Sequence, residues 1–418
     1  MTAGLPEPRA AAPDPSSIGK ARTLPATYLL MVLLGTQPVA TDLYLPALPQ
    51  IAVSFGGQVA QVKWTLTCYI LAFGLAQLFA GGLADHYGRR RMLLWGLGGY
   101  ACAGLGGAFA PGLALLLACR ALQGAATAIC IICVRAAIRD SYSAASGMTV
   151  MARSMSGMSV IALTSPLVGA LTTEYAGWHA AIGLTGLFGA GAWLLVCLTF
   201  PETHVKPAFQ SALGAAACLR NRQFLSCSLL AGMSYSGAMC FLLLSPFIFI
   251  GEFGMPPLWY GAVPAVCSCA FFVGTMTCRR LLQRLDMPAV VRIGAGLTVA
   301  GGASQLLLWL VYGGAPWMLL APQCVYMLGH GFHQPCGQGG AVAPFPANAG
   351  RAAAISGFIL TSLAFIAGQL AARSSLAASQ TLVIVMTSLT LAIALLGWLA
   401  VPRSYRPAWL AADHHEKA

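Results

Sequence analysis

Two charged side chains lie inside long apolar stretches of a chain in which only 8% of the residues are charged. Asp42 stands toward the end of the first apolar stretch, and Arg120 stands well inside the fourth. A carboxylate within a membrane is costly unless it faces water or a cation, so Asp42 is a candidate proton carrier. Arginine stays charged under physiological conditions, so Asp42 must be the titrating partner. We therefore predict a proton-coupling pair, Asp42 and Arg120.

The two charges are expected at similar depth. With a rise of 1.5 Å per residue, Arg120 lies roughly 10 Å and Asp42 roughly 8 Å below the same membrane face. Two simpler interpretations stay open. Asp42 could be an interfacial cap close to water, and the two side chains could form a permanent packing pair.

A second cluster combines charge with glycine in the stretch 82–91, which reads GLADHYGRRR. It separates two apolar stretches, so it is expected to turn in water at a membrane face. Ion pairs between Asp85 and the arginines could hold two helix bundles together in one state and release them in another. The alternative is a solvated turn that follows charge topology. The predicted conformational latch comprises Gly82, Asp85, Gly88, Arg89 and Arg90.

Other polar or helix-breaking residues interrupt the apolar stretches. In the fifth stretch, Gly157, Pro166 and Gly169 predict a helix kink, because proline removes a backbone hydrogen bond and glycine permits close packing. An ordinary kinked membrane helix is the alternative to a functional one. Polar side chains elsewhere are candidates for lining a substrate cavity. The simpler interpretation is that they hydrogen-bond a neighbouring helix, as most such residues do. A histidine among them could also relay protons. The predicted cavity residues are Gln37, Tyr69, Gln123, Tyr235, His330 and Gln334.

The elements that position these residues follow from composition. Of the 418 residues, 58% are hydrophobic, and the mean hydropathy is +0.75. A soluble chain of this length would carry about 25% charged residues, so most of the surface is expected to face lipid. Twelve stretches reach the ~20 mostly apolar residues that a transmembrane helix needs. The predicted spans are 25–47, 62–83, 92–111, 113–136, 149–173, 178–200, 224–250, 258–281, 289–312, 316–343, 351–372 and 380–401.

The spans fall into two sets of six, which predicts an all-α integral membrane fold of two six-helix bundles. Placing both termini in the cytoplasm puts 20 of the 23 Lys and Arg residues on that side, so the positive-inside rule fixes the orientation. The predicted divisions are a disordered cytoplasmic tail at 1–24, a first bundle at 25–200, a cytoplasmic interdomain loop at 201–222, a second bundle at 223–402, and a cytoplasmic tail at 403–418.

Two motifs resemble a known family. The stretch 82–91 resembles the signature loop between the second and third helices of major facilitator transporters. Residues 41–49, TDLYLPALP, resemble the first-helix signature of the Bcr/CflA branch of drug:proton antiporters, and Pro166 lies in a stretch similar to the fifth-helix motif of exporters. Ser165 and Ala170 stand where that motif usually has glycine. The likeness covers residues 25–402 and is sharper in the first half.

The resemblance implies a proton-coupled multidrug antiporter of a bacterial inner membrane, with Asp42 and Arg120 as its coupling residues. Its expected partners are small amphipathic drugs, protons and the lipid bilayer, and a monomer is the default. A metabolite exporter for a sugar, amino acid or siderophore is the first alternative. A membrane-embedded transferase is a remote alternative, because it would need a cluster of catalytic groups at one membrane face. The nearest match, Asp85-His86, has the spacing of the transporter loop at 82–91. A passive channel is similarly disfavoured.

Several other classes are disfavoured by the sequence. The basic residues form no continuous patch, so we expect no nucleic-acid partner. No phosphate-binding GxxxxGK[ST] loop is present. Most of the 14 cysteines lie inside apolar stretches without metal-ligand spacing, so we predict no disulfide, no metal and no cofactor.

Overall fold

The protein is all-α in the residues that the computed structural model describes: 26–57, 59–142, 144–203, 215–312 and 315–400. Apolar stretches of this length become helices because the bilayer core offers no water to bond exposed backbone groups. The predicted tails at 1–24 and 403–418 lie outside the described residues, as does half of the predicted interdomain loop, residues 204–214. The part of that loop that is described contains a short helix, α7, which we did not predict.

The helices of the first half agree closely with the predicted spans. The 56-residue α6 contains two antiparallel spans, because Gly177 departs from helical dihedrals with φ +77° and turns the chain back. The elements of this half are α1 (Thr27–Asp42), a 3₁₀ turn η2 (Leu45–Ala47), α2 (Leu48–Ser54), α3 (Val59–Tyr87), α4 (Arg89–Ala108), α5 (Leu113–Ser141) and α6 (Ala144–Thr199).

The second half repeats the plan with six long helices. Its first long helix begins at a side-chain cap, because Asn221 accepts a hydrogen bond from the backbone N–H of Phe224 at 2.9 Å. The elements are α7 (Ala215–Arg220), α8 (Arg222–Pro246), a π-helical turn η3 (Phe247–Glu252), α9 (Pro257–Tyr260), α10 (Ala262–Leu281), α11 (Met287–Tyr312), α12 (Pro316–Val342), a 3₁₀ turn η4 (Pro346–Asn348), α13 (Ala349–Ala372), α14 (Ala378–Leu395) and a π-helical turn η5 (Leu396–Ala400).

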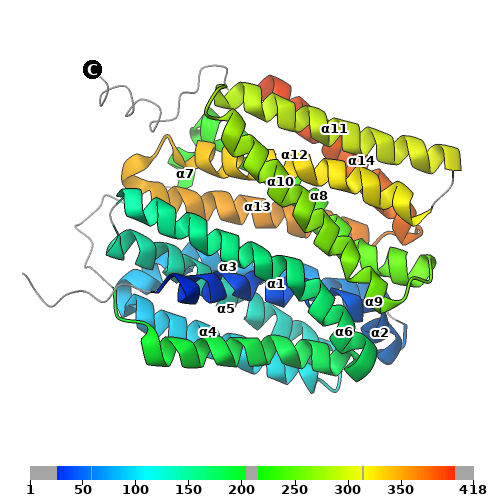
Figure 1. The fold of residues 1–418 in the computed structure, drawn as a ribbon, viewed down its shortest axis with the longest axis horizontal. Helices are drawn as coiled ribbons and strands as arrows, with labels where there is room; N and C mark the ends of the chain where they lie inside the picture. The colour runs from blue at the N-terminus through cyan, green and yellow to red at the C-terminus, as the bar shows by residue number, and fades with distance from the viewer. Residues whose placement is uncertain (1–25, 58, 143, 204–214, 313–314, 401–418) are drawn as a thin grey trace, which may run out of the picture.

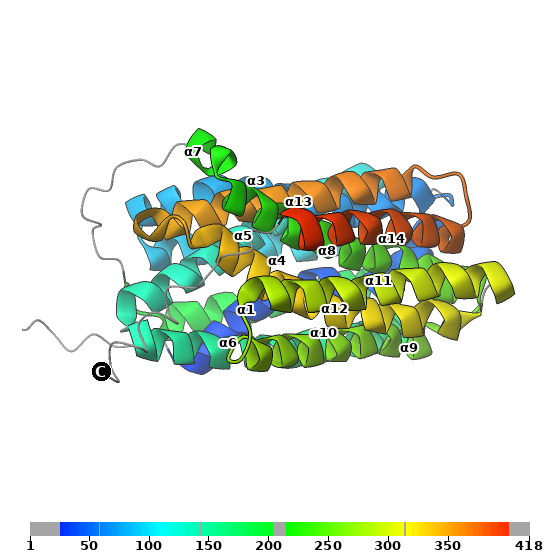
Figure 2. The ribbon, with the colours of Figure 1, turned by 90° about the horizontal axis from the view of Figure 1, so that it is seen from above.

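The two halves lie side by side with their helices roughly along one axis (Figures 1 and 2). Nine described segments are long and apolar enough to cross a membrane, and one of them, Thr149–Thr199, holds two spans. These nine segments therefore supply ten spans. The more polar helices α4 and α12 supply the other two, so all twelve predicted spans are present. Many large apolar side chains stay exposed, including Phe79, Leu198 and Leu310. Such a surface is compatible with lipid and not with water.

Packing across the two halves involves three pairs of helices, α3 with α13, α6 with α10 and α6 with α9. We call the end of the bundle that carries the 85–91 turn and α7 the cytoplasmic end, following the positive-inside rule, and the opposite end the outer end. At the outer end, η2 and α2 of the first half also meet α8, η3 and α9 of the second. The halves are therefore closed against each other at the outer end.

Candidate functional site

A cavity of about 420 Å³ lies between the two halves. It reaches from Asp42, at the outer end of α1, to Arg135 and Met151 at the cytoplasmic ends of α5 and α6. Five of the predicted residues line it, and they come from both halves: Gln37, Asp42, Tyr235, His330 and Gln334. Because the outer ends are packed together and the lining extends to the cytoplasmic ends, this cavity belongs to an inward-facing arrangement.

Two other predicted cavity residues lie elsewhere. Tyr69 and Gln123 do not line this cavity; both are buried around Arg120 in the first half. Gln123 accepts a hydrogen bond from Arg120 and donates through Nε2 to Thr185 Oγ1 at 2.9 Å. The predicted role of Tyr69 and Gln123 in a substrate cavity therefore has no support in the lining of this one, since the sequence does not show which face of a membrane helix meets a cavity.

Asp42 is the last residue of α1 and is half-buried. Its Oδ1 accepts a hydrogen bond from Thr41 Oγ1 at 2.6 Å, and the same hydroxyl lies 3.1 Å from the carbonyl oxygen of Gln37. A hydroxyl has one proton to donate, so these two acceptors compete for it. Of the described residues that line the cavity, Asp42 is the one carboxylic acid.

Arg120 is 2% exposed and its donors meet neutral acceptors. Nη2 donates to the carbonyl oxygen of Ala40 at 2.7 Å, and Nε donates to that of Thr65 at 3.4 Å. The guanidinium carbon lies 4.0 Å from the ring centre of Tyr44 and 4.9 Å from that of Tyr69. Aromatic faces stabilise such a cation by about 2 kcal/mol when it is desolvated. The cation is thus held by carbonyls and rings.

No ion pair among the described residues joins Asp42 to Arg120. The two are linked indirectly, because Arg120 binds the backbone of Ala40, two residues before Asp42. The similar depth of the two charges and their coupling stay predictions; the contact that links them runs through the backbone of α1 and is not a direct pair. Carbonyl oxygens of α1 satisfy the guanidinium, and this leaves the carboxylate facing the cavity.

The two histidines of α12 are both buried and have different surroundings. His330 Nδ1 lies 2.8 Å from Ser234 Oγ, and its ring stacks near Tyr235 and Phe271 at the cavity wall. His333 Nε2 lies 3.1 Å from Thr298 Oγ1, away from the cavity. Both therefore bond a neighbouring helix, as the simpler interpretation of this polar face expected.

The glycines of the predicted kink are contact points. At Gly169, a Cβ would collide with the carbonyl oxygen of Leu43, and at Gly157 it would collide with the side chain of Met31. The other half also comes close to Pro166, because a Cβ on Gly261 would lie 3.0 Å from the Pro166 carbonyl oxygen. This stretch of α6 therefore packs against α1 beside Asp42 and against the second half; the bend itself stays a prediction.

At the cytoplasmic end, the predicted latch residues bind other parts of the first half. Arg89, 2% exposed, donates to Asp85 Oδ1 at 2.5 Å and to Asp140 Oδ2 at 3.1 Å. Arg90 donates to the carbonyl oxygens of Phe200 and Cys197 at 3.0 and 2.9 Å. Among the described residues, no hydrogen bond or ion pair joins the side chains of Asp85, Arg89 or Arg90 to the second half.

Glu202 completes this network and was missed by the sequence analysis. Its two carboxylate oxygens accept from the backbone N–H groups of Arg89 and Arg90 at 2.9 and 3.2 Å, so it caps the N-terminus of α4. Gly88 has φ +89°, a conformation that glycine adopts freely, and a Cβ there would meet Glu202 at 2.7 Å. At Gly82, by contrast, a Cβ would meet no described residue within 4 Å.

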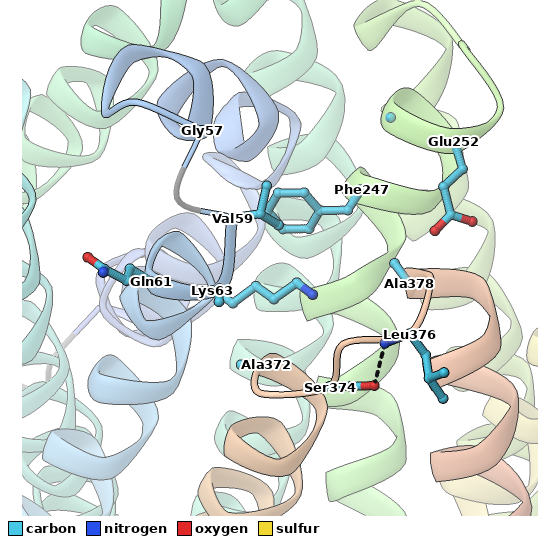
Figure 3. Close-up of a pocket in the computed structure, with 12 residues that line it drawn as sticks. Gly57, Val59, Gln61, Lys63, Phe247, Glu252, Ala372, Ser374, Leu376 and Ala378 are labelled. Carbon is cyan, nitrogen blue, oxygen red and sulfur yellow. Dashed lines mark hydrogen bonds between the residues drawn. The ribbon is translucent and has the colours of Figure 1, made fainter.

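The outer end holds a second cavity of about 590 Å³ between the halves. Lys63 of α3 extends into it toward η3 and lies 5.4 Å from the ring centre of Phe247 (Figure 3). Its side chain is 6% exposed and makes no hydrogen bond or ion pair with a described residue. Glu252 also lines this cavity, and its Oε1 accepts from the backbone N–H of Ser379 at 3.2 Å.

Comparison with known proteins agrees with this architecture. The chain matches the Major Facilitator Superfamily over residues 30–369. It belongs to this superfamily. The facilitator's two halves, inter-half cavity and charged 82–91 turn are thus features of a multi-pass membrane transporter, and no comparison points to an enzyme.

Curated relatives indicate which branch of the superfamily is involved. A chloramphenicol resistance protein of Pseudomonas aeruginosa is 29% identical over 67% of this chain and 67% of its own length. Multidrug resistance protein D of Escherichia coli is 26% identical over 80% and 85%. A bicyclomycin resistance protein homolog of Haemophilus influenzae is 24% identical over 68% and 73%. These relatives confirm the predicted resemblance to the drug-efflux branch.

Proposed function

We propose that this facilitator is a proton-coupled antiporter that exports small amphipathic compounds across a bacterial inner membrane, acting as a monomer. The observation that carries the proposal is the position of Asp42, a carboxylic acid that lines the inter-half cavity at the end where the halves are closed. The names of its relatives, which include chloramphenicol and multidrug resistance proteins, support a drug-like substrate.

In the inward-facing arrangement, a substrate enters from the cytoplasm or the inner leaflet and lies against the apolar wall of the cavity. The halves then rock, the cytoplasmic end closes and the outer end opens. A proton from outside reaches Asp42, neutralises it and displaces the substrate. On return, the proton leaves to the cytoplasm. Arg120 acts through the Ala40 carbonyl, because that bond ties α5 to the end of α1 that carries Asp42.

The charged turn takes part in the same cycle. In this arrangement Arg89 and Arg90 stiffen the first half, and no described residue lies within 4 Å of a Cβ built on Gly82. We propose that the cytoplasmic ends of the second half approach Gly82 when that end closes, so that the turn forms a latch in the outward-facing arrangement. Glycine is suited to such an approach because it has no side chain to block it.

Transport by purified protein in liposomes tests the coupling. With one proton exchanged per substrate, a gradient of one pH unit is worth about 1.4 kcal/mol and supports about tenfold accumulation. We expect the wild-type protein to accumulate chloramphenicol in response to the gradient, and Asp42→Asn to lose this response. Glu252→Gln, which changes a carboxylate of the outer-end cavity and not of the cavity that Asp42 lines, is the control. Unchanged gradient-driven transport by Asp42→Asn would remove Asp42 from the mechanism.

A further inference from the structure

Arg135 is the second charged side chain in the lining of the inter-half cavity, and nothing assigned so far explains it. It lies on α5 near the cytoplasmic end, six residues before the helix ends, and it is exposed. Among the described residues, no hydrogen bond or ion pair satisfies it. The other two arginines of α5 differ: Arg120 is bonded to carbonyls, and Arg139 donates to Asp140 Oδ1 at 3.3 Å.

The cavity offers Arg135 no counterion. Asp42 is at the other end: Arg120, whose guanidinium contacts the backbone beside Asp42, is 15 residues earlier on α5, or roughly 22 Å along the helix. The lining near the cytoplasmic ends of α6 and α12 includes Met151, Met155 and Gln338, which are uncharged. The cavity is therefore polarised, with a cation at its mouth and an acid at its closed end.

A guanidinium in this position has five N–H donors in a planar fork that matches a carboxylate. A charged hydrogen bond contributes about 1.5–3 kcal/mol, more than an uncharged one. Methionine side chains are flexible and polarisable, so they can pack against apolar bodies of different shapes. The mouth of the cavity thus combines one fixed anion-binding group with an adaptable apolar wall.

We propose that Arg135 is a specificity-determining residue that binds a carboxylate or similar anionic oxygen group of an amphipathic substrate as it enters the cavity. The proposal rests on the proposed function and deepens it by naming a substrate class. The anionic group pairs with Arg135 while the apolar body lies against the methionines. An amphipath with a positive head group, by contrast, meets a like charge at the mouth and is disfavoured.

Three pyrene amphipaths with one apolar body test this proposal: pyrenebutyrate, pyrenebutanol and a pyrenebutyl trimethylammonium salt. Binding to purified protein is measured in lipid-free detergent by energy transfer from tryptophan to pyrene. We expect Arg135→Gln to weaken the binding affinity for pyrenebutyrate about tenfold, equivalent to about 1.4 kcal/mol, and the affinity for pyrenebutanol less than about twofold. Arg135→Lys should retain part of the preference for the anion, and Arg135→Glu should favour the trimethylammonium probe.

Arg139→Gln is the matched control, because Arg139 lies one helical turn away on α5 and does not line the cavity. It should leave all three affinities unchanged. Equal losses for the three probes in Arg135→Gln, or no loss, would overturn the proposal while leaving proton-driven export intact. Absence of binding of every probe to the wild-type protein would refute the cavity as the substrate site, and the Arg135 proposal with it.

The anion could also be a lipid phosphate, which shares this chemistry. Repeating the pyrenebutyrate titration in nanodiscs of phosphatidylcholine, with and without phosphatidylglycerol, separates the two sources. Equal affinity in both supports a substrate contact. A loss of pyrenebutyrate binding in phosphatidylglycerol that disappears in Arg135→Gln would show that Arg135 is a lipid site, and would overturn its assignment to substrate.

Discussion

The two ends of the molecule are held together in different ways. At the outer end the two halves touch each other through small residues and backbone, as where Gly261 meets the Pro166 carbonyl oxygen. At the cytoplasmic end the charged groups bind within the first half, as where Arg89 joins Asp85 and Asp140. The charge network therefore stiffens the first half, whereas close packing of small residues and backbone closes the two halves against each other at the outer end.

The largest expected effect comes from blocking the outer contact. Gly261→Leu places a branched side chain where a Cβ alone would lie 2.9 Å from the Cβ of Ala170 and 3.0 Å from the Pro166 carbonyl oxygen. Outer closure should fail, and transport should fall to less than about a tenth, because a cost of 1.4 kcal/mol already changes an equilibrium tenfold. Hydrogen exchange of segments 45–57 and 254–261 should accelerate. Slow exchange in these segments would contradict the closed outer end.

Gly82→Leu makes the complementary change at the cytoplasmic end. The present arrangement has room for this side chain, so thermal stability and outer-end hydrogen exchange should match the wild type. Transport should fall severalfold, because the leucine obstructs closure of the cytoplasmic end. Normal transport by Gly82→Leu would show that no close approach occurs beside this glycine.

Arg89→Gln tests whether the charge network stiffens one half. Removing a partner from a buried ion pair costs about 3–5 kcal/mol, so the melting temperature should drop by several degrees. Outer-end hydrogen exchange should be unaffected at temperatures where the variant is folded. Arg139→Gln is the control, since its side chain is 64% exposed and exposed pairs contribute about 0–1 kcal/mol. Equal melting temperatures for the two variants would contradict this reading.

Lys63→Met should have the smallest effect of the four substitutions, and it should stabilise outer closure where Gly261→Leu disrupts it. Burying an ammonium without a hydrogen-bonded anion costs several kcal/mol, of which the Phe247 ring recovers about 2 kcal/mol; Glu252 lines the same cavity but forms no ion pair with Lys63. The substitution removes that cost, so the outer-closed arrangement should gain stability. Hydrogen exchange at the outer end should therefore slow severalfold. Lys63→Arg, which keeps the charge, should not slow it. Faster exchange in Lys63→Met would mean that the stabilisation by the Phe247 ring exceeds the cost of burying the ammonium.

Much of the fold was predictable because each span needs a long apolar stretch, and lipid leaves such a stretch no alternative to helix. The site was less predictable. Asp42 could be placed at the cavity because a lone acid in an apolar helix needs a wet face, whereas Tyr69 and Gln123 could equally face the cavity or Arg120. The burial of Lys63 could not be predicted, since the sequence does not show that η3 covers it. Glu202 follows α6, and its role depends on helices far apart in the chain.

The way Arg120 is held has a consequence for leakage. Its guanidinium is buried in the first half and anchored to carbonyls and aromatic rings, one of them the carbonyl of Ala40 two residues before Asp42, so we expect it to act as a fixed positive barrier near the closed end of the cavity. A hydronium ion that follows a file of water past this point would be repelled. We expect the carrier to stay proton-tight between substrate cycles, and Arg120→Gln to let a pH gradient collapse faster in substrate-free liposomes.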